Sequence, residues 1–378
     1  MQREVSEMIQ KAGQRRFGSY KQEDVVFLLK DLSDVRLEGN TEEREKRIQG
    51  GQHYSETLPI EYNPPEHYLQ VFWETLAEYK TKVAFCTAVV AEQIYRRKGQ
   101  NTVLVSLARA GTPIGILMKR YIQFKYRENI PHYSISIIRD RGIDENALNY
   151  ILKSHPGCNI QFVDGWTGKG AISIELTKSV EDFEEKYGVK LDDSLAVVAD
   201  PGYCTDLFGT REDFLIPSAC LNSTVSGLVS RTVLNDAYIG TNDFHGAKYY
   251  QELEEYDVSE QYLEQIASQF THINEHELEQ AIAEIKKAEA VSFKGMKEVL
   301  EIKEEFGVET ANYVKPGVGE TTRVLLRRVP WKILMKDPDS PYVRHIIMLA
   351  KERNVEIIPY PNMSYTCCGL IKKVGEAK

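Results

Sequence analysis

The sequence predicts an α/β protein: a mostly parallel β-sheet with helices on both faces, preceded by a helical segment and followed by a small α/β domain. Three observations lead to this prediction. Apolar residues recur at helical spacing through residues 66–99. From Asn101 onward, four apolar strands alternate with turns and helical patterns, which is typical of a parallel sheet covered on both faces. After Gly317 the composition changes and a shorter alternation begins.

These patterns divide the 378 residues into four parts, which suits a chain about twice the usual domain size. A helical lead-in or lid is expected at 1–100, with DVVFLLKDL (24–32) as one of its helices. The sheet core is expected at 101–250 and a helical arm, with charges alternating at i,i+4 spacing, at 251–313. The small domain at 314–378 is predicted as helix, strand, helix, strand and a terminal glycine-bearing helix.

Composition excludes several classes of protein. Hydrophobic residues make up 42% and charged residues 27% of the chain, as in ordinary globular proteins. The six cysteines are dispersed and none form a CxxC pair, which argues against a disulfide framework and a zinc ribbon. The N-terminus has no apolar signal region, and no segment approaches 18 uninterrupted apolar residues. We therefore expect a cytoplasmic protein without a membrane partner.

The net charge of −9 is unevenly distributed. Residues 314–378 carry 12 Lys and Arg against 6 Asp and Glu, so this part is basic and the rest is strongly acidic. A basic module is the footprint that nucleic-acid binding requires, although small domains also vary in charge by chance.

Four of the predicted strands end in polar or glycine-rich turns: ARAGT, RDRGID, DGWTGKG and DPGYC. Ligands of open α/β sheets bind at the carboxyl ends of the strands. If these strands are neighbours, the four turns meet in one crevice. Each turn alone is weak evidence, because strand-to-helix loops favour Gly, Asp and Thr for capping reasons.

The third turn, DGWTGKG, has the features of an anion cradle. Its three glycines allow successive N–H groups to turn inward just before a helix begins. Thr167 adds a hydroxyl donor and Lys169 a positive charge. Neither the Walker A spacing nor a GxGxxG fingerprint is present. A tight structural turn with a solvent-facing lysine is the alternative.

The strand that runs into Asp164 and this loop resembles the PRPP loop of type I phosphoribosyltransferases, and VSLARAGTPIG resembles their pyrophosphate loop. The resemblance implies a phosphoribosyltransferase-like sheet and Mg²⁺ as cofactor, with Asp164 on the ribose diol and as metal ligand. It also implies binding of a phosphorylated ribose of the PRPP type and transfer of phosphoribosyl to a nucleobase-like acceptor. Gly165 stands where that family has a second acidic residue. The residues implied in 5-phosphate or pyrophosphate contacts are Ala108, Arg109, Ala110, Gly111, Gly165, Thr167, Gly168, Lys169 and Gly170, and Arg139 and Asp140 would act over the leaving phosphates.

Several longer strings identify the chain as a member of one bacterial family, known as cysteine protease StiP and also described as phosphoribosyltransferase-like proteins of tellurite-resistance stress operons. They include IQGGQHYSE, VDGWTGKGA and DFLIPSACLNSTVSGLVSR, and the resemblance extends from about Phe17 to the end. Because fold does not settle chemistry, the two descriptions remain alternatives. A catalytically degenerate nucleotide-binding protein is a third.

A thiol protease needs a thiolate, a histidine within hydrogen-bond reach and an oxyanion hole. Cys204 and Cys220 follow turn-like segments, and His53 and His245 lie in polar settings. No local signature of a protease class surrounds them, and an isolated cysteine is more often a small buried hydrophobe. We therefore rank this thiol site second to the transferase.

The hydroxyl-rich stretch from Ser218 to Ser230, with Ser223 and Thr224, could line a pocket and bind a base, or form a close-packed helix start. His53, Tyr54 and Glu56 could form a lid or a satisfied polar cluster.

The helix–strand pattern that opens with GETTRVLLRR resembles the pelota and ribosomal L7Ae type of RNA-binding domain. This resemblance implies RNA as a partner. The alternative is a small α/β domain used for dimerisation or for capping the active site. The implied RNA contacts are Lys315, Gly319, Glu320, Thr321, Arg323 and Arg327.

Overall fold

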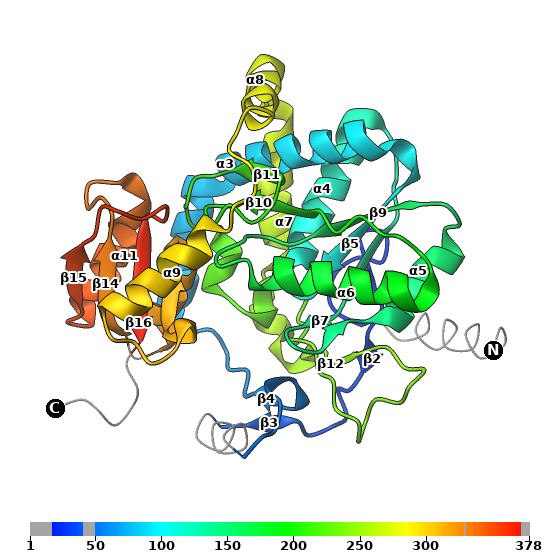
Figure 1. The fold of residues 1–378 in the computed structure, drawn as a ribbon, viewed down its shortest axis with the longest axis horizontal. Helices are drawn as coiled ribbons and strands as arrows, with labels where there is room; N and C mark the ends of the chain where they lie inside the picture. The colour runs from blue at the N-terminus through cyan, green and yellow to red at the C-terminus, as the bar shows by residue number, and fades with distance from the viewer. Residues whose placement is uncertain (1–16, 41–49, 329, 372–378) are drawn as a thin grey trace.

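The computed structural model describes residues 17–40, 50–328 and 330–371, and it is a mixed α/β protein (Figure 1). A six-stranded sheet has the order β1-β6-β5-β9-β10-β11, and every adjacent pair is parallel. The mostly parallel sheet predicted from the sequence is therefore confirmed. Its strands are β1 (Val26–Phe27), β5 (Thr102–Leu107), β6 (His132–Ile135), β9 (Asn159–Val163), β10 (Leu195–Ala199) and β11 (Leu207–Thr210).

Helices cover both faces of this sheet. One face packs against α3 (Glu66–Lys98) and α4 (Gly111–Tyr126), and α7 (Ser259–Ala267) packs on the outside of these two helices. The other packs against α5 (Glu145–Ser154) and α6 (Ala171–Tyr187). All six residues of β5 are buried, since a strand between two helical layers exposes neither face.

The helix predicted over 24–32 is wrong. Val26–Phe27 forms the edge strand β1, which pairs with β6, and Lys30–Asp31 forms β2, which pairs with β12 (Gly246–Ala247). Residues 25–29 are an unbroken apolar run without helical spacing, and such a run is equally compatible with a short buried strand.

Short paired segments connect the larger elements. β3 (Glu38–Gly39) pairs with β4 (Leu58–Pro59), and β7 (Ile137–Ile138) forms a small antiparallel hairpin with β8 (Gly142–Ile143) directly after β6. None of the described helices combines the length and apolar character needed to cross a membrane.

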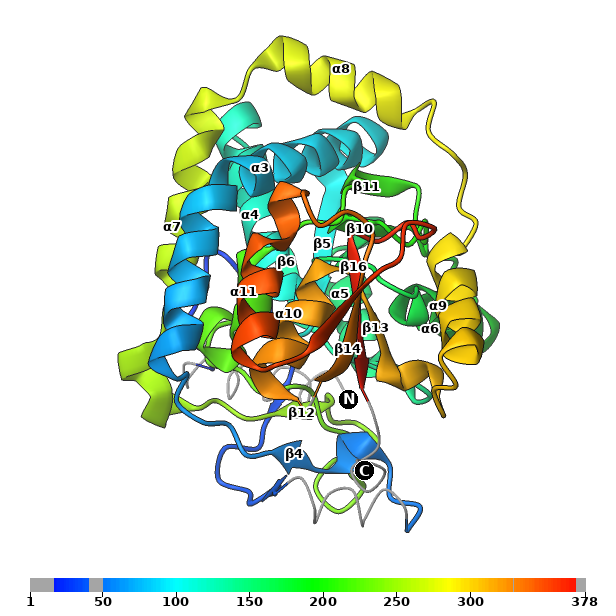
Figure 2. The same ribbon diagram turned by 90° about the vertical axis from the view of Figure 1, so that its left-hand side faces the viewer.

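The arm predicted to be helical is interrupted. α8 (Glu275–Ile285) and α9 (Lys294–Glu305) are joined by an irregular segment that runs down one side of the molecule in Figure 2. The four-part division of the chain made from the sequence stays a prediction.

The C-terminal part contains a second sheet of order β13-β16-β14-β15. Its strands are β13 (Val314–Pro316), β14 (Pro330–Met335), β15 (Glu356–Pro359) and β16 (Cys367–Ile371), and its helices are α10 (Val318–Arg327) and α11 (Arg344–Glu352). The helix predicted at the end of the domain is wrong, because β16 is a central strand that pairs on both sides. Cys367, Cys368 and Leu370 are fully buried there, which requires cover on both faces.

Asp213 joins the two sheets. Its side chain is almost fully buried in the loop after β11, and its carboxylate accepts hydrogen bonds from Val318 N at 2.9 Å and Thr366 N at 2.7 Å. The Asp213 carbonyl also accepts from Thr366 Oγ1 at 2.8 Å. Burial raises the pKa of Asp213 to about 6, against the pull of these backbone donors. One carboxylate therefore holds the start of α10 against the first sheet.

Substituting Asp213→Ala should loosen the C-terminal domain from the rest of the protein. Two buried N–H groups would lose their acceptor, at a cost of about 1–3 kcal/mol each. We expect calorimetry to show a lower first transition that separates from the main one. The control is Asp206→Ala, which removes an exposed ion pair with Arg97 worth less than about 1 kcal/mol. A single transition at the wild-type temperature would contradict the role of Asp213.

Candidate functional site

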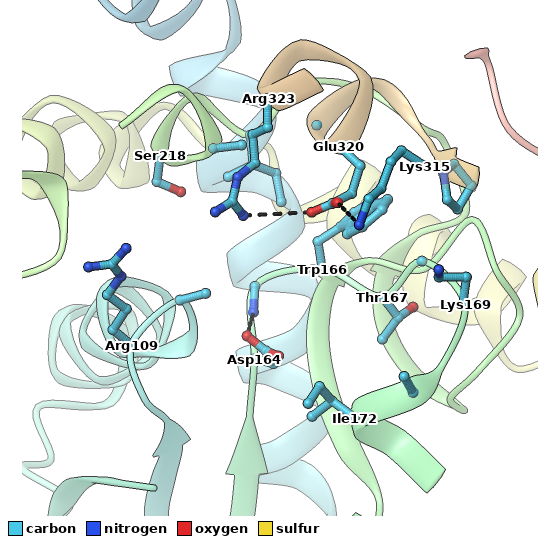
Figure 3. Close-up of a pocket in the computed structure, with 18 of the residues that line it drawn as sticks. Arg109, Asp164, Trp166, Thr167, Lys169, Ile172, Ser218, Lys315, Glu320 and Arg323 are labelled. Atoms are coloured by element: carbon cyan, nitrogen blue, oxygen red, sulfur yellow. Dashed lines mark hydrogen bonds and ion pairs between the residues drawn. The ribbon is translucent and has the colours of Figure 1, made fainter. Parts of the chain in front are cut away.

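A cavity of about 380 Å³ lies at the carboxyl end of the parallel sheet (Figure 3). Three of the four polar turns predicted to converge contribute lining residues to it. The loop that follows β11 and the start of α10 complete the walls. The cavity is therefore built by both sheets, with α10 placed over the strand ends.

The first turn contributes Arg109 and Ala110. The Arg109 guanidinium donates to Val229 O at 3.1 Å and lies 3.9 Å from a Glu61 oxygen. Two predicted neighbours are not among the residues that line the cavity. Ala108 packs beside Leu29 and Val229, and Gly111 starts α4 against the backbone of Val163 with no room for a Cβ.

The second turn contributes Arg139 but not Asp140. Arg139 lines the cavity, and its backbone N–H donates to the Tyr54 hydroxyl at 3.0 Å. Asp140 is exposed at the tip of the β7–β8 hairpin with φ of 65°, and its N–H donates to Glu175. Its carboxylate is therefore not placed to act in the cavity as the sequence predicted.

Asp164 ends β9 inside the cavity. One of its oxygens accepts from Gly165 N at 2.7 Å, and burial raises the pKa of the carboxyl to about 7. The described lining contains one further carboxylate, Glu320, which is ion-paired. Within the described ranges, no three His, Cys, Asp or Glu side chains are grouped to hold a metal. The Mg²⁺ prediction stays a prediction, because magnesium is commonly held by one or two carboxylates together with the phosphates of a substrate.

The glycine loop forms the floor of the cavity. All six residues from Gly165 to Gly170 line it, and α6 begins immediately afterwards. The Thr167 hydroxyl, however, is directed to Asp200, which also accepts from Cys204 N at 2.9 Å and pairs with Arg211. Thr167 therefore anchors the loop rather than offering its proton to a ligand.

Lys169 links the floor to the C-terminal domain. Its ammonium donates to the carbonyls of Ala311 at 2.8 Å and Val314 at 3.4 Å. Burial, together with the nearby charge of Lys315, lowers the pKa of Lys169 to about 8.

In the hydroxyl-rich loop from Ser218 to Ser230, some residues line the cavity and others are buried behind it. Ser218, Asn222 and Ser226 line the cavity. Ser223 and Thr224 are buried and do not line it, and Ser223 donates through both N and Oγ to Glu61. The two residues selected from the sequence are thus next to the lining ones.

The predicted RNA contacts lie at the interface of the two sheets. Lys315, Gly319, Glu320 and Arg323 line the cavity. Thr321 is fully buried, and Arg327 donates to the Cys220 carbonyl at 2.5 Å and to the Asn222 side chain. In this structure, Thr321 and Arg327 therefore contact other parts of the protein and are not exposed for binding RNA.

Cys204 and Cys220 differ in their relation to the cavity. The Cys204 thiol lies behind the glycine loop, 3.6 Å from Gly168 O and next to Gly170. Burial, reinforced by the charge of Asp200, raises its pKa to about 12. Cys220 is fully buried beneath α3, 4.0 Å from Thr75 Oγ1, and burial likewise raises its pKa to about 12.

The two predicted histidines lie elsewhere. His53 bonds to Ser55, and His245 bonds to Ser136 at 2.9 Å beside a separate polar cavity. Burial lowers the pKa of both. In the described part of the chain, no hydrogen bond joins a histidine to a cysteine, so the predicted dyads are not assembled.

Comparisons with known proteins identify the family. A family model described as "Tellurite-like stress resistance cysteine protease StiP" matches residues 18–267, and a model of the PELOTA RNA binding domain matches residues 293–373. A protein of Acinetobacter baylyi named "Cysteine protease StiP" is 33% identical over 371 residues, which cover 95% of each chain. The chain belongs to the StiP family.

Membership in the StiP family overturns the primary functional prediction. Phosphoribosyl transfer is wrong as the predicted activity, because the family and its relative carry the name of a cysteine protease, a hydrolase. Gly165 is the residue that departs from the transferase pattern, and it leaves Asp164 without an adjacent carboxylate at the end of β9. The resemblance to StiP and to a pelota-type domain is confirmed.

Sequence reasoning missed part of the lining. Trp166 lies within a predicted loop and could have been selected by position, and Ser173 follows it at the start of α6. Phe214, Ile216 and Leu221 form an apolar part of the wall. In a sequence, apolar residues that line a cavity cannot be distinguished from apolar residues of the core.

Replacing Asp164 with Asn should raise stability more at high pH than at low pH. The folded carboxyl, with a pKa of about 7 against 3.8 when unfolded, retains a proton that the unfolded chain loses. Stability therefore falls as pH rises through this window, by up to about 1.4 kcal/mol per pH unit. The melting temperature of Asp164→Asn minus that of the wild type should grow from pH 5 to pH 8. The exposed Asp236→Asn is the control, and a pH-independent difference would contradict the assignment.

Proposed function

We propose that the protein is a cysteine peptidase that binds its substrate in the carboxyl-edge cavity and uses Cys204 as nucleophile. The observation that carries the proposal is membership of the StiP family, whose description names a cysteine protease. Cys204 is favoured over Cys220 because its thiol lies against the loop that forms the cavity floor. The role in stress resistance is likewise proposed from the family description.

The chemistry assigns separate tasks to the loop and the thiol. The Cys204 thiolate attacks the carbonyl carbon of the peptide, the C–N bond breaks, and the amine leaves with the proton that the thiol gave up. Water then cleaves the thioester, its hydroxyl goes to the acyl group as a carboxylic acid, and its remaining proton restores the thiol. The free N–H groups at the start of α6 are suited to stabilise the oxyanion, as helix N-termini favour negative charge.

The thiol is latent in this conformation. A thiolate is the reactive form, yet Cys204 is 5% exposed and burial keeps its pKa near 12. Thr167 and Arg211 act in the opposite direction and favour the anion. We propose that a shift of the Gly168–Gly170 loop opens Cys204 to the cavity, so that hydration and Arg211 increase its thiolate fraction.

A finer description of the fold belongs with this proposal. The parallel sheet and the ligand site at its carboxyl edge support a type I phosphoribosyltransferase-like architecture, used here without the transferase chemistry.

RNA binding by the C-terminal domain is a second proposed function. It is supported by the match of residues 293–373 to the PELOTA RNA binding domain and by exposed cations outside the cavity. Arg328 and Arg353 lie together at the end of α10, where Arg353 donates to the Arg328 carbonyl at 3.3 Å.

Substitution of Cys204 by Ala should abolish cleavage of a fluorescent casein or peptide substrate, because the nucleophile is removed. The control is Cys158→Ser, which changes a half-buried cysteine at the opposite edge of the sheet. Mass spectrometry after iodoacetamide treatment at neutral pH should show slow labelling of Cys204 that accelerates when substrate is present. Full activity of Cys204→Ala would refute its role, and six unreactive thiols with substrate would refute the thiol mechanism.

Replacing Arg328 and Arg353 together with Gln should weaken RNA binding by the full chain and reduce its salt dependence. For each phosphate that the protein no longer neutralises, the salt slope should fall by about 1. The measurement is a fluorescence anisotropy titration with a single-stranded RNA at several salt concentrations. Lys186→Gln, on α6 in the first domain, is the control, and an unchanged slope would contradict this surface.

A further inference from the structure

The cavity carries a positive charge in an acidic protein. Among its described lining residues, the cations are Arg109, Arg139, Lys169, Lys315 and Arg323, and the acids are Asp164 and Glu320. The whole chain has a formal charge of −9. An excess of cations gathered in one concave site attracts anionic groups of a ligand.

Two of these cations already face a carboxylate. Glu320 lies between Lys315 and Arg323, with N–O distances of 3.7 Å and 3.6 Å (Figure 3). Burial opposes ionisation of Glu320, but the charges of Arg323 and Lys315 outweigh it and lower its pKa. The walls are thus arranged to hold a carboxylate in its charged form.

The same two cations keep unused hydrogen-bond donors. Their distances to Glu320 are those of ion pairs, longer than hydrogen bonds. In the described part of the chain, no hydrogen bond is made by the side chain of Lys315 or Arg323. An ammonium has three donors and a guanidinium has five, so a second acceptor group can bind without displacing Glu320.

The facing wall offers donors of another kind. α6 starts after Gly170 without a side-chain cap, so its first N–H groups have no partner within the helix. Ser173, in this first turn, is 8% exposed and lines the cavity, and its hydroxyl has no hydrogen-bond partner. A buried hydroxyl without a partner is costly, and a ligand acceptor would satisfy it.

We propose that this cavity is the specificity subsite for a carboxylate of the peptide substrate, held between the first turn of α6 with Ser173 and the Lys315–Arg323 pair. The inference rests on the proposed peptidase function and names the class of substrate: acidic peptides. Trp166 and Leu221 supply apolar wall for the aliphatic part of the bound residue. The carboxylate can come from an Asp or Glu side chain or from the C-terminus of the peptide.

The Glu320 carboxylate is a like charge beside the bound carboxylate and partly neutralises the same cations. Removing its charge should therefore improve binding of acidic peptides, whereas removing a cation should weaken it. Hydrogen bonds to charged groups are stronger than those between neutral groups, so loss of Arg323 should weaken binding by roughly tenfold or more.

The experiment uses the full chain and matched peptide pairs, Glu against Gln at one position and C-terminal acid against C-terminal amide. Both kcat/KM and the dissociation constant, from anisotropy of labelled peptides, are measured. The wild type should prefer the acidic member of one pair by about tenfold or more, and the pair that shows the preference identifies the source of the carboxylate. Arg323→Gln should reduce the preference, Glu320→Gln should increase it, and Lys351→Gln, exposed on α11 and outside the cavity, should leave it unchanged.

Each outcome has a distinct meaning. If the acidic and neutral members of both pairs have equal kcat/KM and equal dissociation constants, the proposed carboxylate subsite is refuted. It is also refuted if Arg323→Gln leaves the preference for the acidic member unchanged. Binding of inorganic phosphate in place of acidic peptides also overturns it and assigns the cavity to a phosphate ligand. If no peptide is cleaved, the peptidase proposal fails, while the dissociation constants still test the carboxylate subsite.

Discussion

The buried carboxylate of Asp213 is the interaction on which the composite cavity depends. It comes from the loop after β11 and binds N–H groups at the start of α10 and beside β16, so one side chain bonds to two segments of the C-terminal part at once. Together with the Arg327–Cys220 and Tyr365–Gly168 hydrogen bonds and the shared apolar core, it keeps Lys315, Glu320 and Arg323 facing the strand ends. Both of its partners are backbone N–H groups. Because the carboxylate is nearly fully buried, water cannot readily replace it as their acceptor.

Close packing of glycines sets the remaining geometry. A side chain at Gly202 would collide with the carbonyl of Gly168, one at Gly295 with the Tyr365 hydroxyl, and one at Gly317 with Trp166. These glycines allow the loop, the thiol-bearing turn and the second domain to lie in contact. The same closeness buries Cys204 and explains why a thiol can lie beside a cavity and still be protonated.

The sequence predicted the parallel sheet because the runs TVLVSL, NIQFV and LAVVA are short and mostly apolar and alternate with helical patterns, as strands covered on both faces do. It also predicted that Arg109, Asp164 and Lys169 share a crevice, since they follow neighbouring parallel strands. It could not predict that α10 covers this crevice, because the docking depends on Asp213, which has no distinguishing pattern in the chain. The short strands β1 and β16 were predicted as helices because a brief apolar run is too short to show either the helical or the strand period.

The chemistry was misassigned for a different reason. A phosphate-loop pattern describes how an anion is held, not which bond is broken.

Because residues from both sheets line the cavity, ligand binding and docking of the two sheets are thermodynamically linked. A ligand that contacts both α6 and α10 binds only while the two sheets are docked, so its concentration shifts the docking equilibrium by mass action. The free energy of this shift grows with the logarithm of ligand concentration, and it acts through Asp213 even though that residue never touches the ligand. Substrate supply would then set how long the two halves of the chain stay together, and with it how long the outward surface of the C-terminal domain keeps a fixed orientation.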